Sequence, residues 1–101
     1  MMYIFIPKNQ TGTESHYWGK EDKENLIEFE LTEDEYYVLY RHHVFDILNS
    51  RYDLWIDNGE SETVTAEQLK ESYKEISLVK GTWLEAVDAA IKYNTCAFLD
   101  F

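Results

Sequence analysis

The chain has 101 residues and a formal net charge of −11; hydrophobic residues make up 45% of it and aromatic residues 16%. This length suits one domain with a thin hydrophobic core. The apolar and aromatic fractions exclude a disordered chain despite the charge. With four glycines and one proline, little of the sequence favours flexibility, so we expect a single folded domain over residues 1–101.

The first part of the chain predicts two strands joined by a long loop. Residues 2–6 are apolar at every position, as in a strand that is covered on both faces. Residues 8–24 are mostly polar and predict a loop, with at most a short strand inside it. Residues 26–31 alternate apolar side chains with Glu28 and Glu30, which predicts a strand with one exposed face.

The middle of the chain predicts a long helix and a second half-exposed strand. Thr32 and Glu35 have the spacing of a capping box, which begins a helix expected to run from about residue 33 to 48. Residues 52–56 alternate apolar and polar or exposed aromatic side chains, which predicts a strand. The Asp-Asn-Gly-Glu turn signal that follows would let residues 62–64 pair back as a hairpin.

The last part of the chain predicts two helices and a terminal strand. Capping-box patterns at Thr65 and Thr82 begin the two helices, and Gly81 separates them. Residues 96–101 are apolar and predict a strand inside the sheet. The resulting fold class is α/β (α+β), a single mixed sheet of about four to five strands with three helices packed on it.

The single cysteine, Cys96, indicates the cellular compartment in which the protein is expected. One cysteine cannot form an internal disulfide, so a reducing, cytoplasmic location is expected. Cys96 lies in an apolar stretch without an electropositive cluster, which favours a buried, unreactive thiol over a nucleophile. Residues 1–8 lack the features of a signal peptide, and no apolar run approaches the roughly 20 residues of a membrane helix.

The negative charge is concentrated in the middle of the chain. Of the 20 acidic residues, 13 lie between Glu21 and Glu62, together with only three basic residues. Such a charge distribution repels phosphate backbones and anionic lipid surfaces and attracts basic proteins. We therefore expect a basic protein partner, with neither direct nucleic-acid contact nor membrane binding. The alternative is that the acidity serves solubility alone.

The sequence contains no recognisable catalytic motif. There is no glycine-rich phosphate loop or nucleophile elbow, and carboxylates are too abundant for any pair to indicate acid–base catalysis. His42 and Asp46 share a helix face but would need further metal ligands, and His16 is the only histidine outside the His42–His43 pair. A calcium loop around Gly59 would place leucine and isoleucine at ligand positions. We expect no enzymatic activity, metal or cofactor.

Aromatic residues among the acids indicate a protein-binding surface. Tyr17 and Trp18 interrupt a polar segment, Tyr37 lies off the core stripe of its expected helix, and Trp55 lies on the outer face of its expected strand. Rings supply burial, and carboxylates supply steering and pairing with lysine or arginine. The alternative is that Trp18 and Trp55 are covered and serve the core. The predicted partner-binding residues are Glu33, Asp34, Glu35, Asp53, Trp55, Asp57 and Glu60.

The segments Glu28–Glu35 and Tyr52–Glu60, in a short, acidic and aromatic-rich chain, resemble the immunity proteins of bacterial contact-dependent inhibition and colicin-type systems. The resemblance implies a tight one-to-one complex with a cognate toxin domain, such as a nuclease whose surface is basic in order to hold phosphate. It assigns no individual functional residue, because such proteins have many unrelated folds. A phage-encoded inhibitor of a host nucleic-acid enzyme would have the same character.

Two other classes of function remain open at the level of sequence. A structural or regulatory module would form a homo-oligomer through an apolar patch or an edge strand, for which the C-terminal strand ending at Phe101 is a candidate. A small enzyme or ligand-binding domain would have a pocket near His42 and His43. The salt dependence of association distinguishes the homo-oligomeric module from a complex with a basic partner. Screening by salt slows an encounter that is driven by opposite charges, but it leaves apolar self-association unaffected.

We predict that charge reversal at Asp53 and Asp57 weakens partner binding and leaves the fold intact. Both acids flank Trp55, and reversal would replace attraction to a basic surface by repulsion. Affinity measured by calorimetry, together with circular dichroism of the variant, checks this expectation. Unchanged affinity would contradict a role for this segment.

Overall fold

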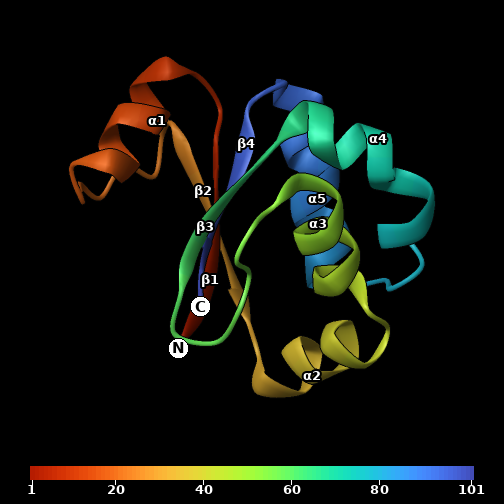
Figure 1. The fold of residues 1–101 in the computed structure, drawn as a ribbon. Helices are drawn as coiled ribbons and strands as arrows, with labels where there is room; N and C mark the ends of the chain where they lie inside the picture. The colour runs from red at the N-terminus through yellow and green to blue at the C-terminus, as the bar shows by residue number, and fades with distance from the viewer.

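The computed structural model describes all 101 residues, as a four-stranded sheet with helices on both of its faces (Figure 1). In chain order the elements are β1 (Met2–Pro7), α1 (Gln10–Tyr17), β2 (Leu26–Leu31), α2 (Glu33–Arg41), α3 (Val44–Tyr52), β3 (Ser61–Thr65), α4 (Ala66–Ile76), α5 (Thr82–Tyr93) and β4 (Cys96–Asp100). In Figure 1, α2 to α5 lie on one side of the sheet, and α1 lies on the other side.

The sheet has the order β2-β1-β4-β3, and every neighbouring pair is antiparallel. The four strands agree approximately with the expected four to five, but the expected mixed sheet is wrong. The reason is visible at the pair Thr65 and Cys96, which are opposite each other in β3 and β4. Because α4 and α5 form a helical hairpin, the chain returns to the end of the sheet where β3 finished, and β4 runs back along it.

The C-terminal strand β4 lies inside the sheet, between β1 and β3, as expected. Its central place means that it cannot be the exposed edge suggested for a homo-oligomer. The edges are β2 and β3 instead. Phe101, just beyond β4, donates its backbone N–H to the carbonyl of Glu60 at 3.1 Å and packs partly buried against the core.

The core fills the space between one face of the sheet and helices α2 to α5. Ile4 and Ile6 of β1 and Leu99 of β4 are fully buried, and they share one cluster with Leu69 of α4 and Trp83 of α5. The Trp83 ring donates its Nε1–H to the carbonyl oxygen of Ile76 at 3.0 Å, so its one polar group is satisfied. Strand alternation assigns these faces, because successive side chains point to opposite sides.

The structure contains five helices where three were expected. One addition is α1, which forms in the polar segment expected to be a loop. It begins at Asn9, whose side chain accepts a hydrogen bond from the Gly12 N–H at 2.9 Å, and it has almost no apolar stripe. Apolar periodicity therefore could not reveal it, although Asn9 is a favourable N-cap.

The second additional helix arises because the expected helix of residues 33–48 is broken at His42 and His43. His43 adopts the left-handed conformation with φ of 61°, which interrupts the hydrogen-bond ladder and changes the direction of the chain. The break lets both α2 and α3 direct apolar side chains to the core, with Leu39 on one helix and Leu48 on the other fully buried.

Residues 52–56 do not form the expected strand. Tyr52 ends α3, and Asp53 is left-handed with φ of 55°. The Asn49 side chain then pairs with the backbone of Ile56, through contacts of 2.7 Å to its N–H and 3.1 Å to its carbonyl. The alternation of buried and exposed side chains is present, but it belongs to an irregular segment. The expected hairpin is therefore also absent, and β3 pairs with β4.

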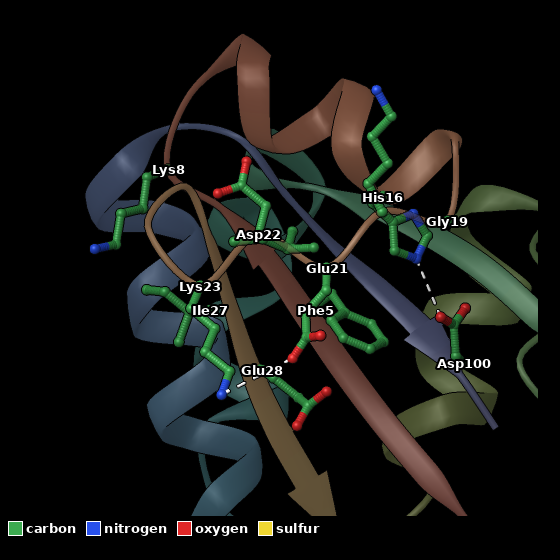
Figure 2. A pocket seen from close by; sticks show the side chains of 12 residues that line it. Phe5, Lys8, His16, Gly19, Glu21, Asp22, Lys23, Ile27, Glu28 and Asp100 are labelled. Carbon is green, nitrogen blue, oxygen red and sulfur yellow. Dashed lines mark hydrogen bonds and ion pairs between the residues drawn. The ribbon is translucent and has the colours of Figure 1, made fainter.

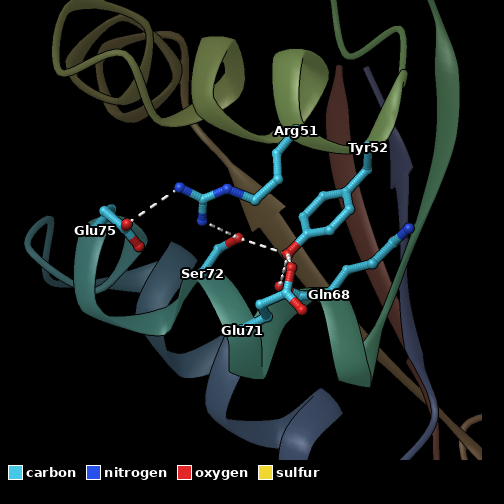
Figure 3. Close-up of polar contacts among 6 residues, drawn as sticks. All are labelled: Arg51, Tyr52, Gln68, Glu71, Ser72 and Glu75. Carbon is cyan, nitrogen blue, oxygen red and sulfur yellow. Dashed lines mark hydrogen bonds and ion pairs between the residues drawn. The ribbon is translucent and has the colours of Figure 1, made fainter.

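A polar network fixes α3 against α4 (Figure 3). Arg51 donates to the hydroxyl of Ser72 at 2.9 Å and lies 3.2 Å from the carboxylate of Glu75. The Tyr52 hydroxyl lies 2.9 Å from Ser72 and 2.8 Å from Glu71. Ser72 is fully buried, so these partners satisfy a hydroxyl that would otherwise be costly to bury. We regard these residues as structural.

Two of the three expected capping boxes are confirmed. Thr32 with Glu35 and Thr65 with Gln68 exchange both bonds of the box, at distances between 2.9 and 3.1 Å. The third expectation is wrong, because Gly81 and not a threonine is the N-cap of α5. Gly81 has φ of 102°, a conformation that side-chain-bearing residues rarely adopt.

We predict that Gly12→Ala destabilises the protein by about 1–3 kcal/mol, because α1 approaches the sheet too closely for a side chain. A Cβ at Gly12 would overlap the carbonyl oxygen of Asn25 and press on Pro7. Urea denaturation measures the effect, and the exposed neighbour Thr11→Ala is the matched control, expected within about 0.5 kcal/mol of wild type. Equal stability of both variants would show that α1 does not pack this closely.

Candidate functional site

The part of the second sheet face that α1 leaves uncovered combines aromatic rings with carboxylates. The strand register places Tyr3 between Glu30 on one neighbour and Asp100 on the other. Adjacent strands lie about 4.8 Å apart, so directly opposite side chains are in contact range. The next row along the strands is formed by Glu28, Phe5 and Phe98. We call these six side chains the open face.

The open face is accessible to a partner. Glu28 and Glu30 are exposed, and the aromatic rings and Asp100 are half-buried. The rings of Tyr3 and Phe5 lie 6.0 Å apart and make a continuous apolar strip between the carboxylates. A cationic side chain above such a strip gains attraction both from the ring face and from the adjacent acid.

Helix α1 forms the upper border of the open face through His16 (Figure 2). The imidazole stacks on the ring of Phe98, with centroids 3.9 Å apart and planes at 6°. Its Nε2 lies 3.0 Å from Oδ2 of Asp100, and its ring centroid is 5.3 Å from that of Phe5. His16 therefore fixes the orientation of Asp100 and of the two phenyl rings.

Between α1, β2 and the segment that joins them lies an open hollow of about 720 Å³, which reaches Phe5, Glu28 and Asp100 of the open face. Its charged lining has both signs, because Lys8, Lys20 and Lys23 lie around it together with Glu21 and other acids. Lys23 and Glu21 form an exposed ion pair at 3.8 Å. The mixture indicates no ligand of a single charge, and the lining contains few apolar side chains.

The wall of the hollow is held by Asp22. Its carboxylate accepts hydrogen bonds from the Ser15 hydroxyl at 2.8 Å and from the side chain and N–H of Asn25 at 3.1 to 3.2 Å. These bonds, the one from Ser15 first, lower the pKa of Asp22. The Asp22 carboxylate therefore holds the loop after α1 in place, and it is not free to bind a ligand.

The sequence-predicted binding residues lie in two separate segments. Glu33, Asp34 and Glu35 form the first turn of α2, and the others lie in the irregular segment 53–60. One contact joins the two segments, because the Tyr36 hydroxyl of α2 lies 3.5 Å from Oδ1 of Asp57. Trp55 is 70% exposed, and Asp53 and Glu60 are also exposed. Whether a partner contacts these residues stays a prediction.

Glu35 differs from the other six predicted residues because its carboxylate has structural partners. Burial tends to raise its pKa, but hydrogen bonds from Thr82 and Thr32 outweigh this effect, and the pKa is lowered. The side chain caps α2 and links it to the start of α5. We therefore expect Glu35 to contribute to stability, while Glu33 and Asp34 project into solvent.

The aromatic residues singled out from the sequence are exposed. Trp18 and Trp55 are each 70% exposed and Tyr17 is 78% exposed, so the alternative that these tryptophans are covered is wrong. Tyr37 is 51% exposed on α2 beside the buried Tyr36. These rings extend the surface that a protein partner could contact beyond the open face.

The histidines do not form a metal centre. His43, and not His42, contacts Asp46, with Nδ1 and Oδ2 2.9 Å apart in an exposed pair. No group of three or more histidine, cysteine, aspartate or glutamate side chains is placed to hold a metal ion. None of the helices combines the length and apolar character needed to cross a membrane.

Sequence reasoning missed most of the open face. Alternation in residues 26–31 correctly predicted that Glu28 and Glu30 point outward, but these acids were not selected for binding. Tyr3 and Phe5 were expected to be covered, because an apolar residue at every position is typical of a buried strand. The juxtaposition depends on strand order, which the sequence does not reveal.

Cys96 is buried, as expected. Loss of hydration raises its pKa to about 11. We predict that the native protein reacts with Ellman's reagent at pH 8 roughly two orders of magnitude more slowly than the urea-unfolded protein, because little thiolate is present. Cys96→Ser gives the background. A native rate equal to the unfolded rate would show that the thiol is accessible and ionised.

Comparison with known proteins identifies no relative of this chain. No protein-family model matches the chain, no curated protein matches its sequence, and no solved structure matches its fold. The interpretation of the open face therefore rests on its own residues and their geometry.

Proposed function

We propose that this chain is an acidic inhibitor of the immunity-protein type, which binds a basic partner one-to-one and covers its active or nucleic-acid-binding surface. The proposed partner is a nuclease-type toxin domain in the cytoplasm. The observation that carries the proposal is the open face, where Tyr3 lies in register between the carboxylates of Glu30 and Asp100. Nucleic acid itself is disfavoured as a ligand, because these carboxylates repel phosphate.

The geometry suits the recognition of lysine and arginine side chains on a protein. Phe5 and Tyr3 offer ring faces, and Glu28 and Glu30 stand beside them on an exposed strand. A guanidinium group stacks on such rings while it pairs with a carboxylate, and it loses less hydration than an ammonium group. A nuclease surface presents the same groups to phosphate, so the open face competes for them.

The negative charge flanks the aromatic strip on both sides. Glu28 and Glu30 lie on the β2 side of Tyr3 and Phe5, and Asp100 lies on the β4 side. The carboxylates of β2 and the carboxylate of β4 therefore lie on opposite sides of the strip. A basic partner that covers the strip meets carboxylates on both sides, which favours fast, steered association.

A homo-oligomeric module is the second candidate, and the β3 edge favours it. Ser61 and Thr63 are exposed, uncharged and located on an outer strand of the sheet. Antiparallel pairing of two copies centred on Thr63 would set no glutamate of β3 opposite another glutamate. Size measurement at low and moderate salt tests this candidate, since a dimer at both salts with no captured protein would support it over the inhibitor.

We predict that Glu28→Lys combined with Glu30→Lys weakens partner binding at least about tenfold, or about 1.4 kcal/mol. The partner is first captured from the source cell with the wild-type chain as bait at two salt concentrations. Its affinity for each variant is then measured by calorimetry. The matched control is Glu67→Lys with Glu85→Lys, the same charge change on two exposed residues of α4 and α5.

The inhibitor proposal also requires a functional readout. The captured protein should be basic and should cleave RNA or DNA, and added wild-type chain should suppress cleavage at one-to-one stoichiometry. The doubly reversed open-face variant should require a correspondingly higher concentration, and the control variant should match wild type. A captured partner that is acidic, or whose cleavage activity the chain does not affect, would refute the proposal.

A further inference from the structure

We propose that the outer edge of β2 accepts an extended segment of the partner as an additional strand, and that this segment has the pattern basic–apolar–basic. The inference rests on the proposed function, because it specifies how a basic partner would bind at the open face. It goes further in requiring backbone pairing in addition to charge.

The register shows which backbone groups of β2 point outward. The carbonyl of Pro7 accepts a bond from the Thr95 hydroxyl, so the backbone at this position of β1 faces β4, and the next residue, Lys8, donates to Asn25 on the β2 side. Because backbone direction alternates along a strand, Phe29 pairs toward β1, and Glu28 and Glu30 direct their N–H and C=O groups away from the sheet.

These outward groups are available for a new strand. β2 is the first strand in the sheet order, and no other segment of the chain hydrogen-bonds to the backbone of Glu28 or Glu30. The upper end of the edge is closed, because the Leu26 N–H donates to the carbonyl of Asp22 at 2.9 Å. The free edge is therefore short and centred on Phe29, with two glutamates that each offer one donor and one acceptor.

The pleat then fixes the side chains of the added segment. Residues directly opposite each other on paired strands point to the same face, so partner residues opposite Glu28 and Glu30 lie over the open face beside the carboxylates. Lysine or arginine at both positions completes two ion pairs. The residue between them points to the other face, beside the half-buried ring of Phe29 that packs on the core, and an apolar side chain suits it.

A second copy of this chain does not fit the same edge. Antiparallel pairing of two β2 edges centred on Glu28, Phe29 or Glu30 sets a glutamate of one copy opposite a glutamate of the other copy. Like charges directly opposite are destabilising in a sheet. Charge at an exposed edge is a known protection against self-pairing, and here the same charge selects a basic segment.

The probe is a short, capped peptide that has lysine at alternate positions and valine between them. We expect it to bind the wild-type chain at low salt and to slow hydrogen exchange of the Glu28 and Glu30 amides at least about tenfold, as newly formed strand bonds do. The Phe29 amide, already paired toward β1, is the internal reference and should change little. Exchange is measured by NMR with and without peptide.

Two matched pairs separate backbone pairing from charge. A peptide with the same side chains but N-methylated at its lysine residues retains the charge and loses the strand donors, and we expect it to bind roughly tenfold more weakly. On the protein, Glu30→Pro removes the outward N–H, and Glu30→Thr removes the same charge but keeps that N–H. We expect the proline variant to bind the peptide several-fold more weakly than the threonine variant.

Equal binding of the methylated and unmethylated peptides, with no slowing at Glu28 and Glu30, would overturn strand addition. The absence of any peptide binding at low salt would overturn it as well. If Glu30→Pro fails to fold, the peptide pair still decides the question with wild-type protein. Neither result refutes the inhibitor proposal, which is judged separately by the captured partner and its cleavage activity.

Discussion

The insertion of β4 between β1 and β3 is the pairing on which the rest of the structure depends. It joins the two ends of the chain, with Tyr3 opposite Asp100, and without it β3 would have no neighbour in the sheet. The same pairing sets Ile4 beside Leu99 on the core face and Phe5 beside Phe98 on the open face. The same strand register therefore places the core residues on one face of the sheet and the open-face residues on the other. A shift of the strand pairing by one residue would move each set of side chains to the opposite face.

Because one register makes both faces, local sequence patterns could predict the parts but not their combination. The capping boxes at Thr32 and Thr65 and the outward direction of Glu28 and Glu30 depend on neighbours within four residues, and these expectations are correct. The row Glu30–Tyr3–Asp100 joins residues from three distant parts of the chain. No periodicity encodes that juxtaposition, so the aromatic strip was expected to be buried.

The incorrect expectations have local physical causes. The left-handed residues His43 and Asp53 end or redirect helices although neither is glycine, and sequence rules give such conformations little weight. Apolar alternation in residues 52–56 reports which side chains are buried, but Asn49 supplies the backbone partners that a neighbouring strand would supply. Alternation therefore identifies burial more securely than it identifies hydrogen-bond partners. The first turn of α2 and the loop 53–60, both predicted from their acids, are separate segments, and the Tyr36 hydroxyl links α2 to the loop at Asp57.

The placement of charge predicts that folding and the proposed partner binding respond oppositely to salt. In the free chain, Glu28 and Glu30 lie two residues apart on the same face of β2, and the net charge is −11, so we expect screening by salt to relieve repulsion and to stabilise the fold. In a complex with a basic protein, the same screening weakens attraction. A bound basic partner also neutralises these carboxylates. Because it binds the folded chain, we expect it to raise the free energy of unfolding by linkage. A surface that is costly for the free domain and favourable in the complex is the electrostatic character expected of a dedicated inhibitor.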